Sequence, residues 1–123
     1  MKTNELKGAA LDWAVAKCEG RDKAMEKNRS GMLSFDAGLH PYMADLDKPG
    51  RWQVYSPSTD WSQGGPIIER ERMHVQPAVG GIWQASLVFG KQLFGPTPLI
   101  AAMRCYVASK LGDEVEIPEE LEP

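Results

Sequence analysis

The chain has 123 residues, of which 42% are hydrophobic and 25% are charged, as expected for a soluble globular domain with one hydrophobic core. No apolar run approaches the roughly 20 residues needed to cross a bilayer, and the N-terminus has neither the basic nor the apolar part of a secretory signal. We therefore expect a cytoplasmic protein without membrane contacts.

The formal net charge of −3 is unevenly distributed. Residues 113–123 hold 6 of the 17 acidic side chains and no Lys or Arg, so residues 1–112 carry 14 basic and 11 acidic side chains. This mildly basic body suits an anionic small molecule. It lacks the dense Lys and Arg stripe that neutralises duplex phosphates, so we expect no nucleic-acid partner.

The first predicted element is a helix from Glu5 to Glu19, which Gly20 ends as a left-handed cap. We expect its apolar face to pack against a sheet. That face contains Leu6, Ala10, Trp13 and Ala14. Residues 21–31 are predicted to form a charged surface connection. Residues 32–50 are interrupted by Gly, Pro and Asp, which predicts irregular structure with one or two short elements.

Three strands are predicted next, over Arg51–Tyr55, Ile67–Val75 and Ile82–Phe89. We expect them to pair antiparallel. The Gly80–Gly81 dipeptide is a suitable connector between the second and third strands, because glycine accepts positive φ angles.

A second helix is predicted after Thr97, which is a suitable N-cap, with Pro98 in its first turn and Gly112 as its C-terminal cap. It should cover the sheet beside the first helix. The expected fold class is α+β: a small antiparallel sheet packed against two main helices, in a single domain over 1–112. Residues 113–123 are expected to form an extended acidic tail.

Cysteine and histidine are too sparse for a metal centre. Cys18 and Cys105 lie in the predicted helices with apolar neighbours, which favours reduced core residues over a disulfide. His40 and His74 are far apart and lack ligands at zinc spacing. Asp45 and Asp47 are better interpreted as turn residues, so we expect no metal or cofactor.

The segment 55–72, YSPSTDWSQGGPIIERER, is predicted to be a ligand-binding loop. Its glycines allow close approach of backbone amides, Trp61 can stack on a base, Asp60 can hold a ribose hydroxyl, and arginines can bind phosphate. The alternative is a tight turn before a strand, and no Walker or dinucleotide fingerprint is present. The predicted ligand-binding residues are Ser58, Thr59, Asp60, Trp61, Gln63, Gly64, Gly65, Arg70, Arg72 and Arg104.

Catalysis has weaker support. On the predicted strand, Glu69 and Glu71 would lie on one side, near His74, and could act as acid and base on a nucleotide. Their alternation with arginines is also typical of a salt-bridged strand face. The serines lack the G-x-S-x-G elbow of a hydrolase nucleophile. We therefore expect a non-enzymatic protein.

Three long motifs carry a resemblance to a known family: LDWAVAKCEG, YSPSTDWSQGGPIIERE and GPTPLIAAMRCYVASKLGDEVEIPEEL. They resemble the NinX-type proteins of lambdoid bacteriophages and prophages, over nearly the whole chain. Residues 25–52 match the family pattern least. The family has no known function, so the resemblance implies a phage origin and the host bacterial cytoplasm, without implying a reaction.

Phage context suggests an accessory protein that counters host defence. The leading hypothesis is sequestration, without catalysis, of an anionic nucleotide-derived immune signal, cyclic or of the ADP-ribose type. Because a small domain has little concave surface, we expect the pocket to form in a homo-oligomer. The alternatives are a protein-interaction module that blocks a host factor, and a small nucleotide hydrolase.

Overall fold

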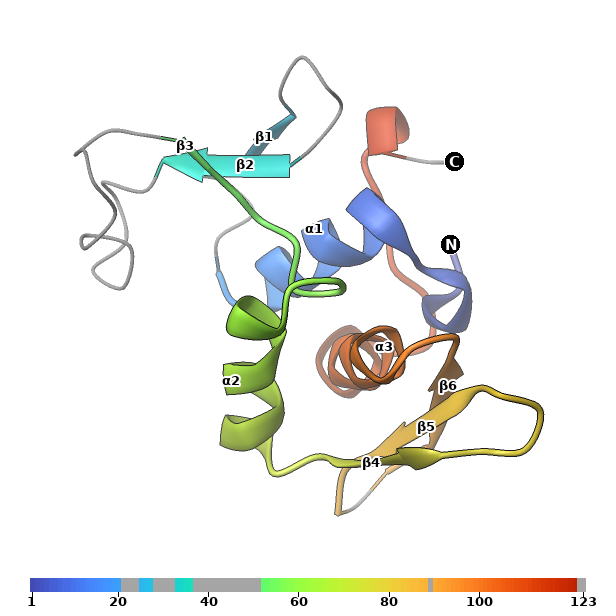
Figure 1. The fold of residues 1–123 in the computed structure, drawn as a ribbon. Helices are drawn as coiled ribbons and strands as arrows, with labels where there is room; N and C mark the ends of the chain where they lie inside the picture. The colour runs from blue at the N-terminus through green and yellow to red at the C-terminus, as the bar shows by residue number, and fades with distance from the viewer. Residues whose placement is uncertain (21–24, 28–32, 37–51, 89, 122–123) are drawn as a thin grey trace.

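The computed structural model describes residues 1–20, 25–27, 33–36, 52–88 and 90–121 (Figure 1). Its elements are η1 (Thr3–Glu5), α1 (Gly8–Cys18), β1 (Met25–Lys27), β2 (Leu33–Asp36), β3 (Trp52–Val54), α2 (Trp61–Glu71), β4 (His74–Pro77), β5 (Trp83–Ser86), β6 (Leu93–Gly95), α3 (Pro98–Leu111) and η5 (Glu119–Leu121). Three α-helices and antiparallel sheets confirm the α+β class. In these ranges, no helix is long and apolar enough to cross a membrane.

Helix α3 lies at the centre of the molecule, with α1, α2 and the β4–β5–β6 sheet around it (Figure 1). Its predicted caps are confirmed: the Thr97 hydroxyl accepts a hydrogen bond from the Ile100 amide at 3.1 Å, and Gly112 ends the helix at a φ of 89°. Half of its residues are fully buried, on more than one side, because the helix has neighbours on several sides. These are Leu99, Ala101, Ala102, Met103, Cys105, Tyr106 and Val107.

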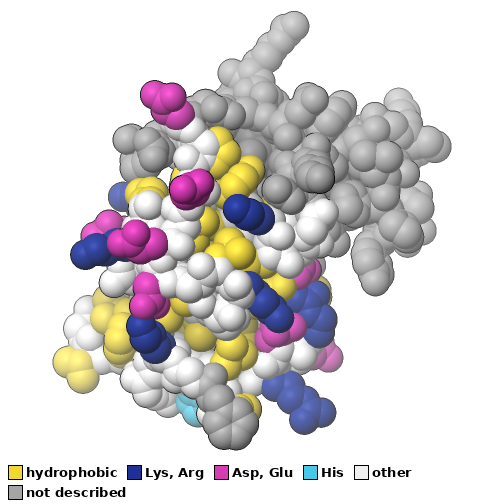
Figure 2. Space-filling view, turned by 180° about the vertical axis from the view of Figure 1, so that it is seen from behind, with side chains coloured by type: hydrophobic (Ala, Val, Ile, Leu, Met, Phe, Trp, Pro, Cys, Tyr) yellow, Lys and Arg dark blue, Asp and Glu magenta, His cyan; other side chains and the backbone are white. Residues whose placement is uncertain are grey.

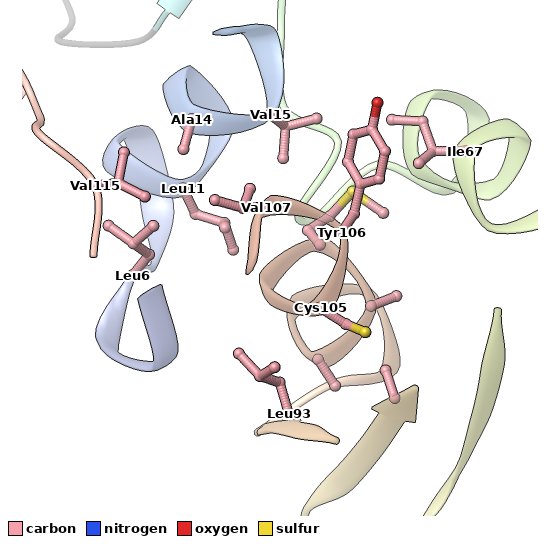
Figure 3. Packing of buried hydrophobic residues seen from close by; sticks show 14 of the residues in the cluster. Leu6, Leu11, Ala14, Val15, Ile67, Leu93, Cys105, Tyr106, Val107 and Val115 are labelled. Atoms are coloured by element: carbon pink, nitrogen blue, oxygen red, sulfur yellow. The ribbon is translucent and has the colours of Figure 1, made fainter. Parts of the chain in front are cut away.

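The predicted first helix is confirmed as α1, although it begins at Gly8 because residues 3–5 form a separate 3₁₀ turn. Leu11, Ala14 and Val15 point toward α3 (Figure 3). We expected α1 to lie beside α3 on the same sheet, and this expectation is wrong. Helix α1 packs on α3 itself, and α3 lies between α1 and the β4–β5–β6 sheet (Figure 1).

The β4–β5–β6 sheet is antiparallel and has one face covered by α3. Gly80 and Gly81 connect β4 to β5 at φ angles of 86° and 78°, as predicted for this dipeptide. The predicted strand at 82–89 is the shorter β5. Strand β6 approaches α3 so closely that a Cβ on Gly95 would lie 2.7 Å from the Ala101 nitrogen, and only glycine fits there.

The predicted strand over 67–75 is wrong, because most of this segment belongs to α2. Gly64, Ile67, Ile68 and Glu71 recur at helical spacing, and these residues are buried or half-buried. Pro66 removes one helical hydrogen bond, yet the helix continues to Glu71 and ends with Arg72 in the left-handed conformation, at a φ of 54°. Only residues 74–75 of the prediction are extended, at the start of β4.

The predicted strand at 51–55 is confirmed as β3, but its partner differs from the expected one. Strand β3 pairs antiparallel with β2, and β2 pairs with β1, so these strands form a second sheet apart from β4–β5–β6. The predictions of irregular structure over 32–50 and of a surface connection over 21–31 fall largely outside the described residues.

The segment after Gly112 was expected to be an extended tail outside the fold, and here the expectation needs correction. Its backbone pairs with the N-terminus: the Thr3 amide donates to the Asp113 carbonyl at 2.8 Å, and the Val115 amide donates to the Met1 carbonyl at 2.9 Å. Val115 is 5% exposed and belongs to the hydrophobic core. The segment packs here because Val115 and Leu121 are apolar residues among the acidic ones.

Candidate functional site

The predicted ligand loop forms the first turn of α2 and the bend that precedes it. Asp60 is the N-cap of α2, and its Oδ1 accepts hydrogen bonds from the Ser62 amide at 2.8 Å and from the Ser62 hydroxyl at 2.6 Å. Gln63 Oε1 accepts from the Ser56 amide at 2.6 Å. These polar side chains therefore satisfy the chain's own backbone, as capping residues do.

Two of the predicted ligand residues are buried inside the protein. Ser58 is 1% exposed, and its amide donates to Asp12 Oδ1 on α1 at 2.9 Å. A Cβ on Gly64 would lie 2.4 Å from the Pro57 carbonyl oxygen. This glycine therefore lets α2 approach its own preceding bend, and it is not available to a ligand.

Asp12 is an acidic side chain held in the core beside this bend. Burial raises the pKa of Asp12 to about 6, and hydrogen bonding from Ser58 opposes the rise. The Ser58 hydroxyl, although near this carboxylate, makes no hydrogen bond of ordinary geometry within the described ranges. With Ser58 and Asp12 both buried, this pair links α1 to the bend and offers no surface to a ligand.

The exposed part of the predicted site is small. Trp61 is 56% exposed at the start of α2, Thr59 is exposed, and Gly65 is half-buried with the Trp61 ring 3.8 Å from where its Cβ would be. The carboxylate of Asp60 already occupies the helix N-terminus, which disfavours an anion there.

Arg70, expected to bind phosphate, is already paired. Its guanidinium binds Glu19 at the end of α1 in bidentate fashion, at 3.1 and 2.8 Å, and also contacts the Tyr106 hydroxyl at 3.1 Å. Hydrogen bonding to Glu19 raises the pKa of Arg70. Its charge is therefore used to join α1, α2 and α3. Arg72, the residue after α2, is exposed.

The candidate hydrolase residues do not form a site. Glu69 and Glu71 were expected on one side of a strand, but on helix α2 residues two apart point in different directions, and Glu71 pairs with Arg70. His74 is exposed on β4, with its Nε2 3.0 Å from Gln76 Oε1.

The described residues contain no group of three His, Cys, Asp or Glu side chains that could hold a metal ion. His40, Asp45 and Asp47 lie outside the described residues. Cys18 and Cys105 are free thiols, and burial raises the pKa of each, which makes them poor nucleophiles and poor metal ligands.

Among the predicted site residues, Arg104 lines a cavity in the described part of the chain, and it lies away from the others. The cavity has a volume of about 700 Å³ and lies between the N-terminal segment, β6, α3 and the segment after Gly112. We call it the Arg104 cavity. Its walls are formed by Lys2, Thr3, Asn4, Ile82, Lys91, Gln92, Leu93, Phe94, Gly95, Pro96, Arg104, Asp113 and Glu114.

The guanidinium of Arg104 is held in place by backbone oxygens. Its Nε donates to the Leu6 carbonyl at 2.7 Å, and Nη1 donates to the Phe94 carbonyl at 2.8 Å. Burial lowers the pKa of Arg104, and within the described part of the chain no carboxylate forms an ion pair with it. Arg104 is therefore a fixed, partly desolvated cation with donors to spare, as anion sites require.

The other charges of the cavity are mixed. Lys91 forms an ion pair with Asp113, and both side chains are largely exposed. Lys2 lies opposite Glu114 in an isolated backbone bridge. Three basic side chains and two acidic ones therefore line the cavity, which leaves a small positive excess around Arg104.

One rim of the cavity is apolar. Ile82 and Phe94 are 39% and 42% exposed, although large apolar side chains are usually buried. Figure 2 shows hydrophobic side chains gathered over the β4–β5 hairpin, with acidic and basic side chains intermingled beside it, where the two ends of the chain lie. Sequence reasoning missed Lys2, Lys91 and Phe94, because nothing along the chain indicates that these positions meet.

Comparisons with known proteins give the family. The family model described as "Bacteriophage P22, NinX" matches residues 2–110. No curated protein is significantly similar in sequence to the chain. Because the match covers most of the chain, this protein belongs to the NinX family of bacteriophage proteins.

Proposed function

We propose that this phage protein binds and sequesters an anionic, nucleotide-derived small molecule in the Arg104 cavity, without catalysis. The observation that carries the proposal is the state of Arg104: a guanidinium fixed by the Leu6 and Phe94 carbonyls, partly desolvated, and paired with no described carboxylate. A partly buried cation without a partner is costly, and an anionic ligand supplies that partner.

The size of the site agrees with this ligand class. Cavities that hold small molecules range from about 300 to 1,000 Å³, and the Arg104 cavity lies within that range. Lys2 adds a second cation, and the apolar rim supplies a surface for an uncharged part of the ligand.

Sequestration suits the site better than turnover. Acid and base catalysis needs titratable groups directed at the reacting atoms. The acidic residues of the cavity are Asp113, which is paired with Lys91, and Glu114, which is exposed. In this proposal the protein acts in the host bacterial cytoplasm and removes a nucleotide-type immune signal, cyclic or derived from ADP-ribose. A homo-oligomer would close the open side of the cavity.

The direct experiment is uptake and release. Purified protein is incubated with cyclic dinucleotides and with ADP-ribose derivatives, separated from free ligand and heated, and the released material is analysed chromatographically. Recovery of intact ligand supports sequestration, whereas altered product would indicate a hydrolase. Absence of uptake of every compound would contradict the proposal.

The second candidate function is a protein-interaction module that blocks a host factor. Its support is Trp61, which is 56% exposed at the start of α2 on the outer surface. Exposed tryptophans are enriched in protein interfaces. If no small molecule is taken up, and Trp61→Ala abolishes capture of a host protein while leaving the thermal midpoint unchanged, this second function replaces the first.

A further inference from the structure

A second hollow adjoins the Arg104 cavity on the β4–β5 hairpin. It has a volume of about 590 Å³ and is more open to solvent than the cavity. We call it the hairpin groove. Its walls are formed by Pro77, Ala78, Val79, Ile82, Gln84 and Phe94.

The two hollows share Ile82 and Phe94. The same strand that presents the Phe94 ring also presents the Phe94 carbonyl to Arg104, at 2.8 Å from Nη1. The fixed cation and the exposed ring are therefore adjacent. A ligand that places its anionic group at Arg104 has an apolar surface within reach.

The groove offers the groups that recognise a planar base. Phe94 is an exposed aromatic ring, Ile82 and Val79 are exposed apolar side chains, and Val79 is 96% exposed. Gln84 lies opposite Phe94 in the β5–β6 register, and its amide can both donate and accept hydrogen bonds. Stacking on an aromatic ring with an amide at the edge of the base is a common way of binding nucleobases.

We propose that the hairpin groove is the base subsite of the Arg104 cavity. The ligand is then a nucleoside phosphate unit that spans both hollows, with its phosphates at Arg104 and Lys2 and its base on Phe94. This inference rests on the proposed function, because it assumes that an anion binds at Arg104. It adds a requirement for the base, which the charge of the cavity alone does not impose.

The experiment compares a nucleotide with its phosphate part. ADP, pyrophosphate and adenosine are titrated into the full chain by isothermal calorimetry at low salt. We expect ADP to bind roughly tenfold or more tightly than pyrophosphate, because stacking of the base adds to the binding of the phosphates. Adenosine should bind most weakly of the three, because charge dominates the site. Arg104→Lys should weaken both ADP and pyrophosphate.

The variants separate the two subsites. Phe94→Ala should reduce ADP affinity to that of pyrophosphate and leave pyrophosphate affinity unchanged. Phe94→Leu keeps apolar volume on the strand and serves as the second variant if alanine lowers stability. It should lose the same amount of ADP affinity, because leucine has no aromatic ring. The matched control is Val88→Ala, an exposed apolar position that lines neither hollow.

Two results would overturn the base subsite while leaving the anion site intact. They are equal affinities of the wild type for ADP and pyrophosphate, and an unchanged ratio of these affinities in both Phe94 variants. Failure of the wild type to bind either compound would contradict the proposed function, and the base subsite with it.

Discussion

Arg70 and Glu19, which are 51 residues apart in the sequence, form a bidentate ion pair with distances of 3.1 and 2.8 Å. Tyr106 on α3 completes the contact, because its hydroxyl donates to Glu19 and accepts from Arg70. The three helices are thereby joined at one place. An arginine that looked available for phosphate is instead part of the structure.

Arg70→Ala should therefore lower stability without weakening anion binding. Half of the Arg70 side chain is exposed, so we expect a loss of about 1 kcal/mol in the free energy of unfolding, as for a partly screened pair. Arg72→Ala is the matched control and should change little, because Arg72 is exposed at the end of the same helix. Urea denaturation and calorimetry with ADP measure the two effects. A loss of ADP affinity in Arg70→Ala with stability unchanged would return Arg70 to the binding site.

The two neighbouring glycines of α2 should respond oppositely to alanine. In Gly64→Ala the new Cβ would lie 2.4 Å from the Pro57 oxygen and 2.7 Å from Leu99 Cδ2, so we expect a loss of about 2 kcal/mol or more. In Gly65→Ala the new Cβ would lie 3.8 Å from Trp61 Cε3, which is an ordinary contact. The variant should therefore gain up to about 1 kcal/mol of stability, because alanine has the higher helix propensity. Thermal unfolding of both variants tests the prediction. Equal midpoints would contradict the helical packing described for this segment.

Asp12 should make stability depend on pH. Its pKa rises from 3.8 in the unfolded chain to about 6 in the native protein, so the native state binds more protons between these values. Stability from this group is therefore fully present below pH 4 and is lost as the pH rises through 6, by about 3 kcal/mol in total.

Asp12→Asn isolates that contribution, since asparagine keeps the oxygen that accepts from the Ser58 amide. The stability difference between Asp12→Asn and the wild type should shift in favour of the variant by about 2 kcal/mol between pH 4 and pH 7. Urea denaturation at several pH values gives this difference directly. A difference that stays constant over that range would show that Asp12 is not the buried group described here.

Ser58→Ala should be nearly neutral for both stability and binding. The hydroxyl is buried and makes no hydrogen bond of ordinary geometry within the described ranges, so its removal relieves a polar group and leaves only a small gap. The measurement is the thermal midpoint with and without ADP. A variant of normal stability that no longer responds to ADP would mean that this hydroxyl reaches the ligand after all.

Asp113 should compete with an anionic ligand for Lys91. Asp113→Asn removes this competitor while its backbone carbonyl still accepts from the Thr3 amide, so we expect ADP affinity to rise by about two- to fivefold, more at low salt. Glu116→Gln is the control, because Glu116 is an exposed acid of the same segment outside the cavity. If both variants raise ADP affinity equally, the cause is the change in net charge, and the Lys91–Asp113 ion pair does not compete with the ligand.

The parts of the fold that were predictable have local causes. Helix α3 begins after Thr97 and Pro98 and ends at Gly112, and these are capping residues that can be recognised in the sequence. Gly80–Gly81 supplies the positive φ angles of the β4–β5 turn. Helix α2 was missed because Pro66 and the alternating charges after Ile68 resemble a strand boundary and a strand. Asp60 and Gln63, spaced as in a capping box, were the local signal for a helix start.

The candidate site was less predictable because it is assembled from distant segments. Arg104 was one of the arginines predicted to bind phosphate, together with Arg70 and Arg72. Lys2, Phe94 and Asp113 come from three other parts of the chain, and only the packing of β6 and of both chain ends around α3 brings them together. Two of the residues predicted to bind a ligand, Ser58 and Gly64, are buried because they hold α2 against its neighbours.

Arg104 is the residue that we propose receives the anion. The most direct measurement follows the Nε–Hε signals of the arginine side chains by two-dimensional ¹⁵N NMR while ADP is added to the wild-type protein. We expect the Arg104 signal to shift and saturate, while the Arg70 signal stays in place, because Arg70 Nε donates to Glu71 and the rest of its guanidinium is held by Glu19. A stationary Arg104 signal accompanied by a shift of the Trp61 indole signal would contradict this account and return the ligand to the first turn of α2.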